Sequence, residues 1–166
     1  MSDTNNSWLE SADAGRLRDF PYLWITWIAK YLAGTNDCKL SIWFRATHQD
    51  YEKIPMVGNL KAWEVNHRNL RDEMIADLTI KNPTAKITIE KQNSLQVTGR
   101  STIISGKPDI MVRYKDENRI DIYDAKTGAD KPADRFQMLL YRWLYRYIDK
   151  TLQIGLFLNY RGMERE

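Results

Sequence analysis

The sequence has little cysteine and no long apolar run. Its 166 residues include one cysteine, Cys38, and no stretch that reaches the roughly 18 to 20 apolar residues of a membrane span. A single cysteine excludes an internal disulfide and a four-cysteine iron–sulfur cluster, and we expect Cys38 to be a small buried residue. Residues 1–7 lack the basic segment and hydrophobic core of a secretory signal. These absences predict a cytoplasmic protein without a membrane partner.

The chain also lacks a strong charge of either sign, internal repeats and low-complexity tracts. Its formal net charge is +3 with a pI near 8.9, which permits a polyanionic partner without requiring one. The composition, 43% hydrophobic and 28% charged, is ordinary for a globular domain with a sizeable core. Charge alone therefore does not identify a nucleic-acid partner.

Residues 19–58 are expected to form an N-terminal helical part. Asp19 can cap a first helix with Pro21 in its first turn, and Gly34 suits its end. A second helix is expected over about residues 37–48. The six tryptophans and nine tyrosines of the chain could stack on unpaired bases, but their helical spacing favours core packing. The first helix is expected to turn inward Trp24, Trp27, Ile28 and Tyr31.

Residues 59–77 predict a third helix, which begins with a capping asparagine and carries an apolar stripe. At about 100° per residue, His67 falls within about 40° of this stripe, so it faces inward and needs a partner. A core histidine and a metal ligand are both open, since neutral imidazole can bind Mn²⁺. We expect Glu64 to be solvated and keep Glu73 and Asp77 as outside candidates. The stripe comprises Leu60, Trp63, Leu70, Met74 and Leu78.

Two carboxylates and a lysine stand out in the second half of the chain. Residues 119–126 alternate as a strand, so Asp124 and Lys126 project side by side from one face. The apolar run 108–114 suits a second strand, and a hairpin between the two can bring Asp109 opposite Asp124. Such a set can hold a divalent cation while the lysine steadies a water that attacks a phosphodiester. The alternative is a surface ion pair that contributes little.

A long helix and further strands complete the order of elements. The segment from Pro132 to about Lys150 has no glycine or further proline, and it predicts a helix with Gln137 and Tyr141 on adjacent turns at the border of its apolar face. That face is expected to comprise Phe136, Leu140, Trp143, Leu144, Tyr147 and Ile148. The solvated side carries Arg135, Arg142, Arg146 and Lys150. Strands are predicted within residues 87–90, 95–104 and 152–160.

Three short motifs resemble the PD-(D/E)XK nuclease superfamily and, within it, the RecB-like branch. The patterns Gly-x-x-Asp, Asp-x-Lys-Thr-Gly and Gln-x-x-x-Tyr are matched in that order by residues 106–109, 124–128 and 137–141. The resemblance covers roughly residues 60–160. It implies an α/β fold with a central mixed β-sheet flanked by helices, as in restriction endonucleases. The nuclease core would occupy about residues 59–160 of a single domain.

The resemblance implies a role for each motif residue. The metal ligands would be Asp109, Asp124, His67 and the carbonyl oxygen of Ala125. Lys126 would be the catalytic lysine, and Gln137 and Tyr141 would be supporting helix residues near the metal or the DNA. The implied cofactor is Mg²⁺ or Mn²⁺, without an iron–sulfur cluster. The implied substrate is single-stranded or duplex DNA.

The activity that follows is hydrolysis of DNA by an exonuclease or an endonuclease, in repair, defence or a phage process. One alternative is a catalytically silent nucleic-acid-binding module that keeps the nuclease fold, and the complete acidic pair with its lysine argues against it. A second alternative is a structural subunit that binds a protein partner or another copy of the chain through its aromatic-rich N-terminal helices.

Overall fold

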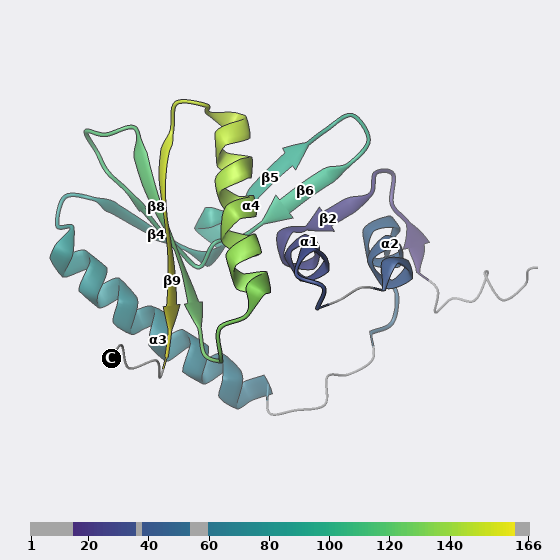
Figure 1. The fold of residues 1–166 in the computed structure, drawn as a ribbon, viewed down its shortest axis with the longest axis horizontal. Coiled ribbons are helices and arrows are strands. Elements are labelled where there is room, and N and C mark those ends of the chain that lie inside the picture. The colour runs from purple at the N-terminus through teal and green to yellow at the C-terminus, as the bar shows by residue number, and fades with distance from the viewer. Residues whose placement is uncertain (1–14, 36–37, 54–59, 162–166) are drawn as a thin grey trace, which may run out of the picture.

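The computed structural model describes residues 15–35, 38–53 and 60–161 (Figure 1). Its main body is a four-stranded sheet in the order β4-β7-β8-β9. The β4–β7 and β7–β8 pairs are antiparallel and the β8–β9 pair is parallel, so the sheet is mixed, as the resemblance to the superfamily implies. The four strands are β4 (Lys86–Ile89), β7 (Ile110–Arg113), β8 (Arg119–Lys126) and β9 (Gln153–Tyr160).

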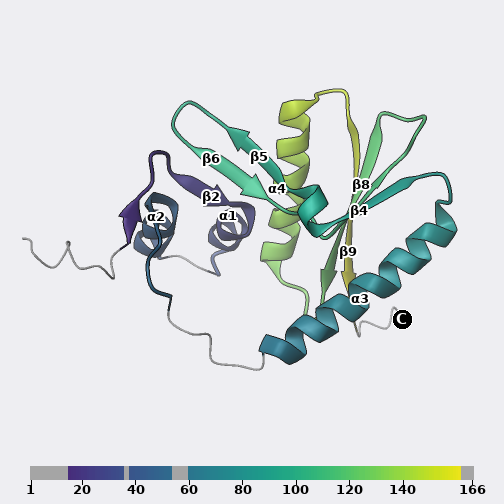
Figure 2. The same cartoon turned by 180° about the vertical axis from the view of Figure 1, so that it is seen from behind.

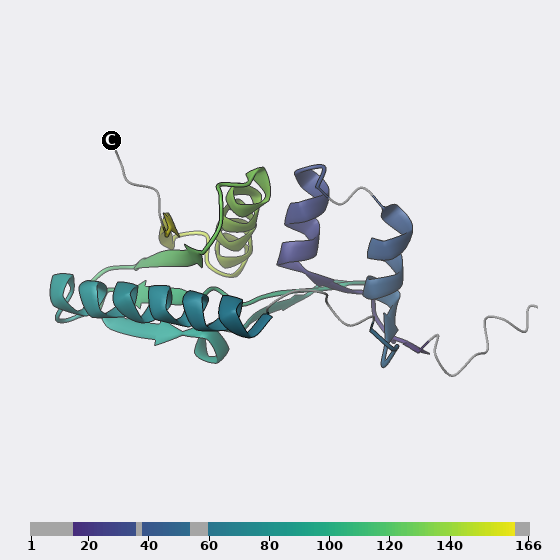
Figure 3. The same ribbon diagram turned by 90° about the horizontal axis from the view of Figure 1, so that it is seen from below.

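Two helices cover opposite faces of this sheet. Side chains of α3 (Leu60–Lys81) pack with one set of β7 and β8 residues, and side chains of α4 (Pro132–Ile148) pack with the alternating set. The α3 layer contains Leu70, Met74, Leu78, Ile110, Val112 and Ala125. The α4 layer contains Met111, Ile120, Ile122, Met138, Tyr141 and Leu144. In Figure 3, α3 runs along the lower side of the molecule and α4 stands above it.

The N-terminal part contains strands as well as helices, which corrects the purely helical segment expected from the sequence. Strand β2 (Tyr22–Trp24) pairs in parallel with β6 (Ile103–Gly106), which pairs antiparallel with β5 (Leu95–Thr98) (Figure 2). Helix α1 (Ile25–Leu32) therefore begins later than predicted and is not capped by Asp19. The aromatic and β-prone segment before Ile25 joins a sheet edge instead of starting the helix.

A second helix and a small sheet complete the N-terminal part. Helix α2 (Lys39–Thr47) matches the expected second helix, and β1 (Arg16–Leu17) pairs with β3 (His48–Gln49). Helix α1 packs against α4, which joins this part to the four-stranded sheet. Gly34 ends α1 with a φ of +67°, the left-handed conformation in which glycine meets no steric penalty. The expected cap of α3, Asn59, lies outside the described residues.

Several N-terminal side chains expected in the core are exposed. Tyr31 is 40% exposed, Trp43 is 54% exposed, and Cys38 is also exposed. Both helices are short, and each buries few residues. Helix α1 buries Ile25 and Ala29, and α2 buries Ala46, so only a narrow side of each helix packs against the rest of the protein. Within the described ranges, no helix is both long and apolar enough to cross a membrane.

Candidate active site

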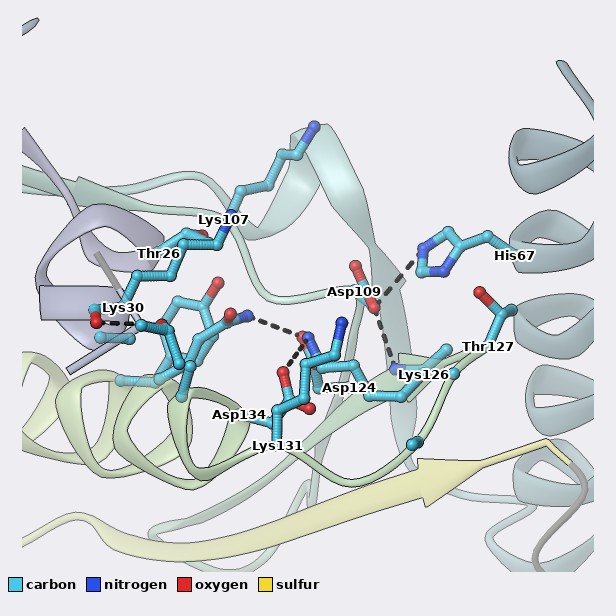
Figure 4. A pocket seen from close by; sticks show the side chains of 18 of the residues that line it. Thr26, Lys30, His67, Lys107, Asp109, Asp124, Lys126, Thr127, Lys131 and Asp134 are labelled. Atoms are coloured by element: carbon cyan, nitrogen blue, oxygen red, sulfur yellow. Dashed lines mark hydrogen bonds and ion pairs between the residues drawn. The ribbon is translucent and has the colours of Figure 1, made fainter. Parts of the chain in front are cut away.

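The β7–β8 hairpin brings the two acids together. Ile110 pairs with Tyr123, so one further step of this register places Asp109 opposite Asp124. Oδ2 of Asp109 accepts a hydrogen bond of 3.0 Å from the backbone N–H of Ala125, which holds its carboxylate beside β8. Figure 4 shows both acids in the same pocket, with His67 on one side and Lys126 on the other. The facing acids follow from the alternation and the hairpin that the sequence predicts.

Asp124 is a buried carboxylate with one oxygen poorly satisfied. It is 2% exposed, and its Oδ1 accepts a hydrogen bond of 3.0 Å from Nε2 of Gln137. Its Oδ2 lies 2.5 Å from Nζ of Lys126, yet among the described residues it accepts no hydrogen bond of regular geometry. We take this contact to be an ion pair with poor directionality. Burial, and then the charge of Asp109, raise the pKa of Asp124 to about 6 despite the nearby ammonium.

Lys126 is held between two carboxylates. Its Nζ lies 2.5 Å from Asp124 and 3.3 Å from Oδ1 of Asp134, a residue of the first turn of α4. Burial alone would lower the pKa of this lysine, but the two carboxylates outweigh it and leave the pKa above its usual value. The side chain is therefore an ammonium at neutral pH. It can donate hydrogen bonds and carry positive charge, but it cannot accept a proton there.

Asp134 is a third acid that the sequence motifs did not reveal. The hydroxyl oxygen of Tyr160 lies 3.0 Å from both Asp134 and Asp130, so its single proton is shared between two carboxylates. Tyr160 is the partner of Lys126 in the β8–β9 register, which explains why the end of β9 meets the start of α4. An acid in the first turn of a helix is common enough that its position alone carried no functional signal.

His67 finds its partner in Asp109. Its Nε2 lies 3.6 Å from Oδ2 of Asp109, and its ring stacks on Trp63 with centroids 5.2 Å apart and an interplanar angle of 12°. The inward orientation predicted for His67 is therefore present. Trp63, which was predicted to belong to the same core stripe, is instead 52% exposed. It precedes the buried part of α3, which runs from Leu70 onward.

The other acids of α3 lie away from the pocket. Glu64 is exposed, as predicted. Glu73 is also exposed and accepts a hydrogen bond of 3.0 Å from Arg161. Asp77 is exposed and does not line the pocket. The upstream helix thus contributes His67 to the site and neither of the two outside candidates.

Gln137 and Tyr141 are central in the buried face of α4, which places them deeper than predicted. They are 7% and 2% exposed. A Cβ at Gly106 would clash with side-chain atoms of Ile25 and Tyr141, so the motif glycine allows α1 and α4 to approach β6. Burial, and then the charges of Asp124 and Asp109, raise the pKa of Tyr141, so its hydroxyl keeps its proton.

The apolar face predicted for α4 is only partly correct in its orientation. Leu144 is buried and Leu140 packs against the core, but Trp143, Tyr147 and Ile148 are between 52% and 62% exposed. The buried face contains Ala133, Gln137, Met138, Tyr141 and Leu144. Apolar side chains lie on two sides of this helix. The prediction from hydrophobicity chose the side with the larger side chains, which is the more exposed one. The basic residues Arg135, Arg142, Arg146 and Lys150 are exposed, as predicted.

All six predicted side chains line one open cavity of about 940 Å³. They are Asp109, Asp124, Lys126, His67, Gln137 and Tyr141. Three further lysines, Lys30, Lys107 and Lys131, line the same cavity, and Figure 4 shows them around the acids. Thr26 and Lys30 come from α1 and were not foreseen, because no local pattern indicates that this helix faces the acids.

The donor set suits a hard divalent cation. Asp109 and Asp124 supply carboxylate oxygens, the preferred ligands of Mg²⁺, and the poorly satisfied Oδ2 of Asp124 is the kind of buried atom that a cation would stabilise. His67 and Ala125 line the same cavity. Within residues 15–35, 38–53 and 60–161, no three histidine, cysteine or acidic side chains stand grouped as a metal cluster. The residues present therefore fit a cation through the acidic pair first.

A family model matches the chain, and a solved structure is distantly similar to it. A solved structure described as the crystal structure of SSO0001 is similar, with 13% sequence identity and a TM-score of 0.42. The likeness covers 88% of this chain and 65% of that one, so this chain spans less than two thirds of its length. No curated protein matches the chain. A sequence model of the PD-(D/E)XK nuclease superfamily matches residues 38–161, three quarters of the chain and every predicted site residue. The chain therefore belongs to the PD-(D/E)XK nuclease superfamily.

Proposed function

We propose that this protein is a metal-dependent deoxyribonuclease of the RecB-like branch. The observation that carries the proposal is the environment of Asp124, a buried acid that faces Asp109 and touches Lys126 in an open cavity. A buried charge that is left partly unsatisfied costs stability, and such groups concentrate at functional sites. The chain belongs to a superfamily whose members are typically metal-dependent nucleases. We therefore infer that the costly burial of Asp124 is retained because phosphodiester hydrolysis requires it.

Asp109 and Asp124 would hold the cation, together with His67 and the carbonyl oxygen of Ala125. A bound Mg²⁺ or Mn²⁺ would polarise the scissile phosphate and lower the pKa of a coordinated water. The N–H of Ala125 holds Asp109 in place with its hydrogen bond of 3.0 Å. Gln137 does the same for Oδ1 of Asp124, which leaves Oδ2 directed toward the lysine.

Lys126 would act as a cation and hydrogen-bond donor. Its raised pKa keeps it protonated at neutral pH, so it orients the attacking water and offsets negative charge that develops on the phosphate. Removing one such donor from a preorganised site typically slows chemistry by about 10² to 10³. Asp134 holds the other side of the ammonium and so restricts where Nζ can lie.

A polyanionic substrate is supported by the lysines of the cavity wall. Lys30, Lys107 and Lys131 make no ion pair with any described carboxylate and remain available for phosphates. The assignment to the RecB-like branch rests on Gln137 and Tyr141, whose spacing matches the third motif and whose side chains reach the same cavity. We assign DNA as the substrate on the basis of that branch resemblance.

The test is incubation with single-stranded and duplex DNA, with and without Mn²⁺. Metal-dependent cleavage that is lost in Lys126→Ala supports the proposal. Lys150→Ala is the matched control, because Lys150 is exposed at the far end of α4 and does not line the cavity. Circular and linear substrates separate endonuclease from exonuclease activity.

Two outcomes would contradict the proposal. A metal-independent gel shift without cleavage would favour the catalytically silent binding module. Neither cleavage nor a shift would favour the structural subunit. Undiminished cleavage by Lys126→Ala would remove this lysine from the mechanism even if the protein proves to be a nuclease.

A further inference from the structure

An exposed tryptophan lies next to the proposed catalytic acids. Trp63 is 52% exposed although one face of its ring stacks on His67. His67 in turn lies 3.6 Å from Asp109. Exposing this much aromatic surface is unfavourable in water, and the cavities that Trp63 lines also contain charged side chains.

Trp63 also joins two cavities. It lines the cavity of the acids and a neighbouring cavity of about 460 Å³. The two cavities share His67, Lys107 and Asp109, so the second begins where the proposed catalytic site ends. A linear polymer bound at the acids can therefore continue along Trp63 into the second cavity.

The second cavity contains two cations that no described carboxylate holds in an ion pair. Three cations and three carboxylates line it: Arg68, Arg71, Lys107, Glu64, Glu90 and Asp109. Arg71 forms an ion pair with Glu90, so these two charges offset each other. Arg68 and Lys107 form no ion pair with any described carboxylate, and Figure 4 shows the ammonium of Lys107 outside the contacts that join Asp109, Asp124 and Lys126.

We propose that Trp63 stacks on an unpaired base of a single-stranded nucleic acid whose flanking phosphates contact Arg68 and Lys107. An aromatic platform beside unpaired cations is the arrangement that binds single strands, because every base has a π-face and every nucleotide a negative charge. A paired base within a duplex does not offer its face to a side chain. This proposal rests on the proposed function, because it assumes that the strand runs from the catalytic acids toward Trp63. It adds that the substrate is single-stranded.

The other interpretation of Trp63 is that it only positions His67. The two interpretations differ in a measurement made without metal. If Trp63 acts through His67 alone, its removal changes metal-dependent cleavage and leaves metal-free binding of a single strand unaffected. If Trp63 contacts a base, metal-free binding changes as well.

The experiment measures binding in EDTA, where cleavage cannot occur. The probe is an oligothymidylate of about 12 nucleotides with a central 2-aminopurine, whose fluorescence falls when its base stacks on an aromatic ring. We expect the full chain to quench this fluorescence. Trp63→Ala should weaken binding about 5- to 150-fold, the range expected for loss of one stacked base, and should abolish the quenching.

Three variants make the test specific. Trp143→Ala is the matched control, because Trp143 is also 52% exposed but lies on α4 outside both cavities, and it should bind like the wild type. Trp63→Phe keeps an aromatic face and should retain most of the quenching. Arg68→Ala should keep the quenching and reduce the slope of log affinity against log salt by about 0.7, the value for one phosphate contact on a single strand. Urea unfolding midpoints check that each variant is folded.

The proposal is overturned if folded Trp63→Ala binds the probe within about twofold of the wild type with unchanged quenching. It is also overturned if a duplex of the same sequence binds as tightly as the single strand and is equally weakened by the substitution. Its failure is distinct from failure of the proposed function. A wild-type protein that quenches the probe but never cleaves DNA keeps the stacking site, whereas one that cleaves without quenching keeps only the nuclease.

Discussion

Strand β8 carries two buried aspartates, three residues apart, whose surroundings differ sharply. Asp121 is 1% exposed on the α3 face, and Asp124 is 2% exposed on the α4 face. Asp121 accepts hydrogen bonds of 2.8 Å from the hydroxyl of Tyr114 and of 3.0 Å from both Nε and an Nη of Arg119. Gly155 on β9 leaves room for this carboxylate, since a Cβ there would clash with it. Asp124 has one regular hydrogen bond, from Gln137.

The comparison separates an acid that is fully paired within the fold from the acid assigned to the proposed catalytic site. The charge of Asp121 is matched by a guanidinium and a hydroxyl, so its burial is compensated within the fold. Burial and Asp121 raise the pKa of Tyr114 to about 12, so the tyrosine stays protonated and donates. Asp124 instead has a buried oxygen without a regular hydrogen bond, an ion pair with Lys126 and a raised pKa. Burial alone therefore does not distinguish the two acids, whereas the incomplete hydrogen bonding of Asp124 beside the cavity does.

The largest effect is expected at Lys126, the charged partner of Asp124. Lys126→Ala should reduce the rate of Mn²⁺-dependent DNA cleavage by at least about 10² to 10³, because the cation that offsets charge on the phosphate is lost. Single-turnover cleavage assays measure this rate. Urea unfolding should show that the fold persists. An unchanged rate would mean that Lys126 only stabilises the fold. The contrast drawn between Asp121 and Asp124 would then fail.

A substitution at Asp124 should stabilise the metal-free protein at neutral pH. The folded-state pKa of Asp124, about 6, lies above its ordinary value of 3.8, so the group favours folding below about pH 4 and this contribution is lost as pH rises through 6. Asp124→Asn should therefore raise the free energy of unfolding by up to about 3 kcal/mol at pH 7.5 in EDTA and by nearly nothing at pH 4. Urea titrations at the two pH values measure the difference.

The same substitution should weaken binding of Mn²⁺, which isothermal titration measures at pH 7.5. Unchanged Mn²⁺ affinity would count against Asp124 as a ligand. A lower stability of Asp124→Asn at pH 7.5 would show that the buried charge is better compensated than its contacts indicate.

Asp121→Asn should change the free energy of unfolding in the opposite direction to Asp124→Asn. It weakens the contacts to Arg119 and Tyr114 and should lower the free energy of unfolding by about 2 kcal/mol, a value reduced because Arg119 is partly exposed. Cleavage per folded molecule should stay at the wild-type rate, because Asp121 lies on the face away from the cavity. A rate loss without a stability loss would contradict the assignment of Asp121 to the structural set.

The smallest effect is expected at Tyr160. Tyr160→Phe removes the proton shared by Asp130 and Asp134, so Asp134 holds Lys126 less firmly. We expect a loss of stability below about 1 kcal/mol and a fall in cleavage rate below about tenfold. Parallel urea and cleavage measurements test this, and a loss as large as that of Lys126→Ala would mean that Asp134 contacts the reacting groups itself.

The mixed sheet followed from the resemblance to the superfamily, whereas the meeting of Asp109 with Asp124 was predicted from local rules alone. Strand alternation fixes which side chains share a face, and a short charged connection fixes the hairpin. His67 was also turned inward correctly, since helical periodicity determines its direction relative to Leu70 and Met74. These predictions needed no knowledge of the tertiary arrangement.

The failures concern tertiary contacts that no local pattern records. Trp63 shares the helical stripe of Leu70, yet the helix extends past the packed layer at that point, so periodicity assigned it to the core. The same limitation explains the misoriented face of α4, where Gln137 is buried because it serves Asp124. Lys30 was missed because the acids it faces are distant in sequence, and Asp134 because an acid in the first turn of a helix carries no functional signal by its position.

Helix α1 forms part of the cavity wall, and this affects how the cavity can change during evolution. The superfamily model begins at residue 38, whereas Thr26 and Lys30 belong to α1, which is attached through the β2–β6 pairing and its packing on α4. Substitutions on that helix can change the shape and charge of the opening while the hairpin that holds the acids stays intact. If the proposed function holds, such substitutions would change which polymers reach the acids and leave the acids themselves in place.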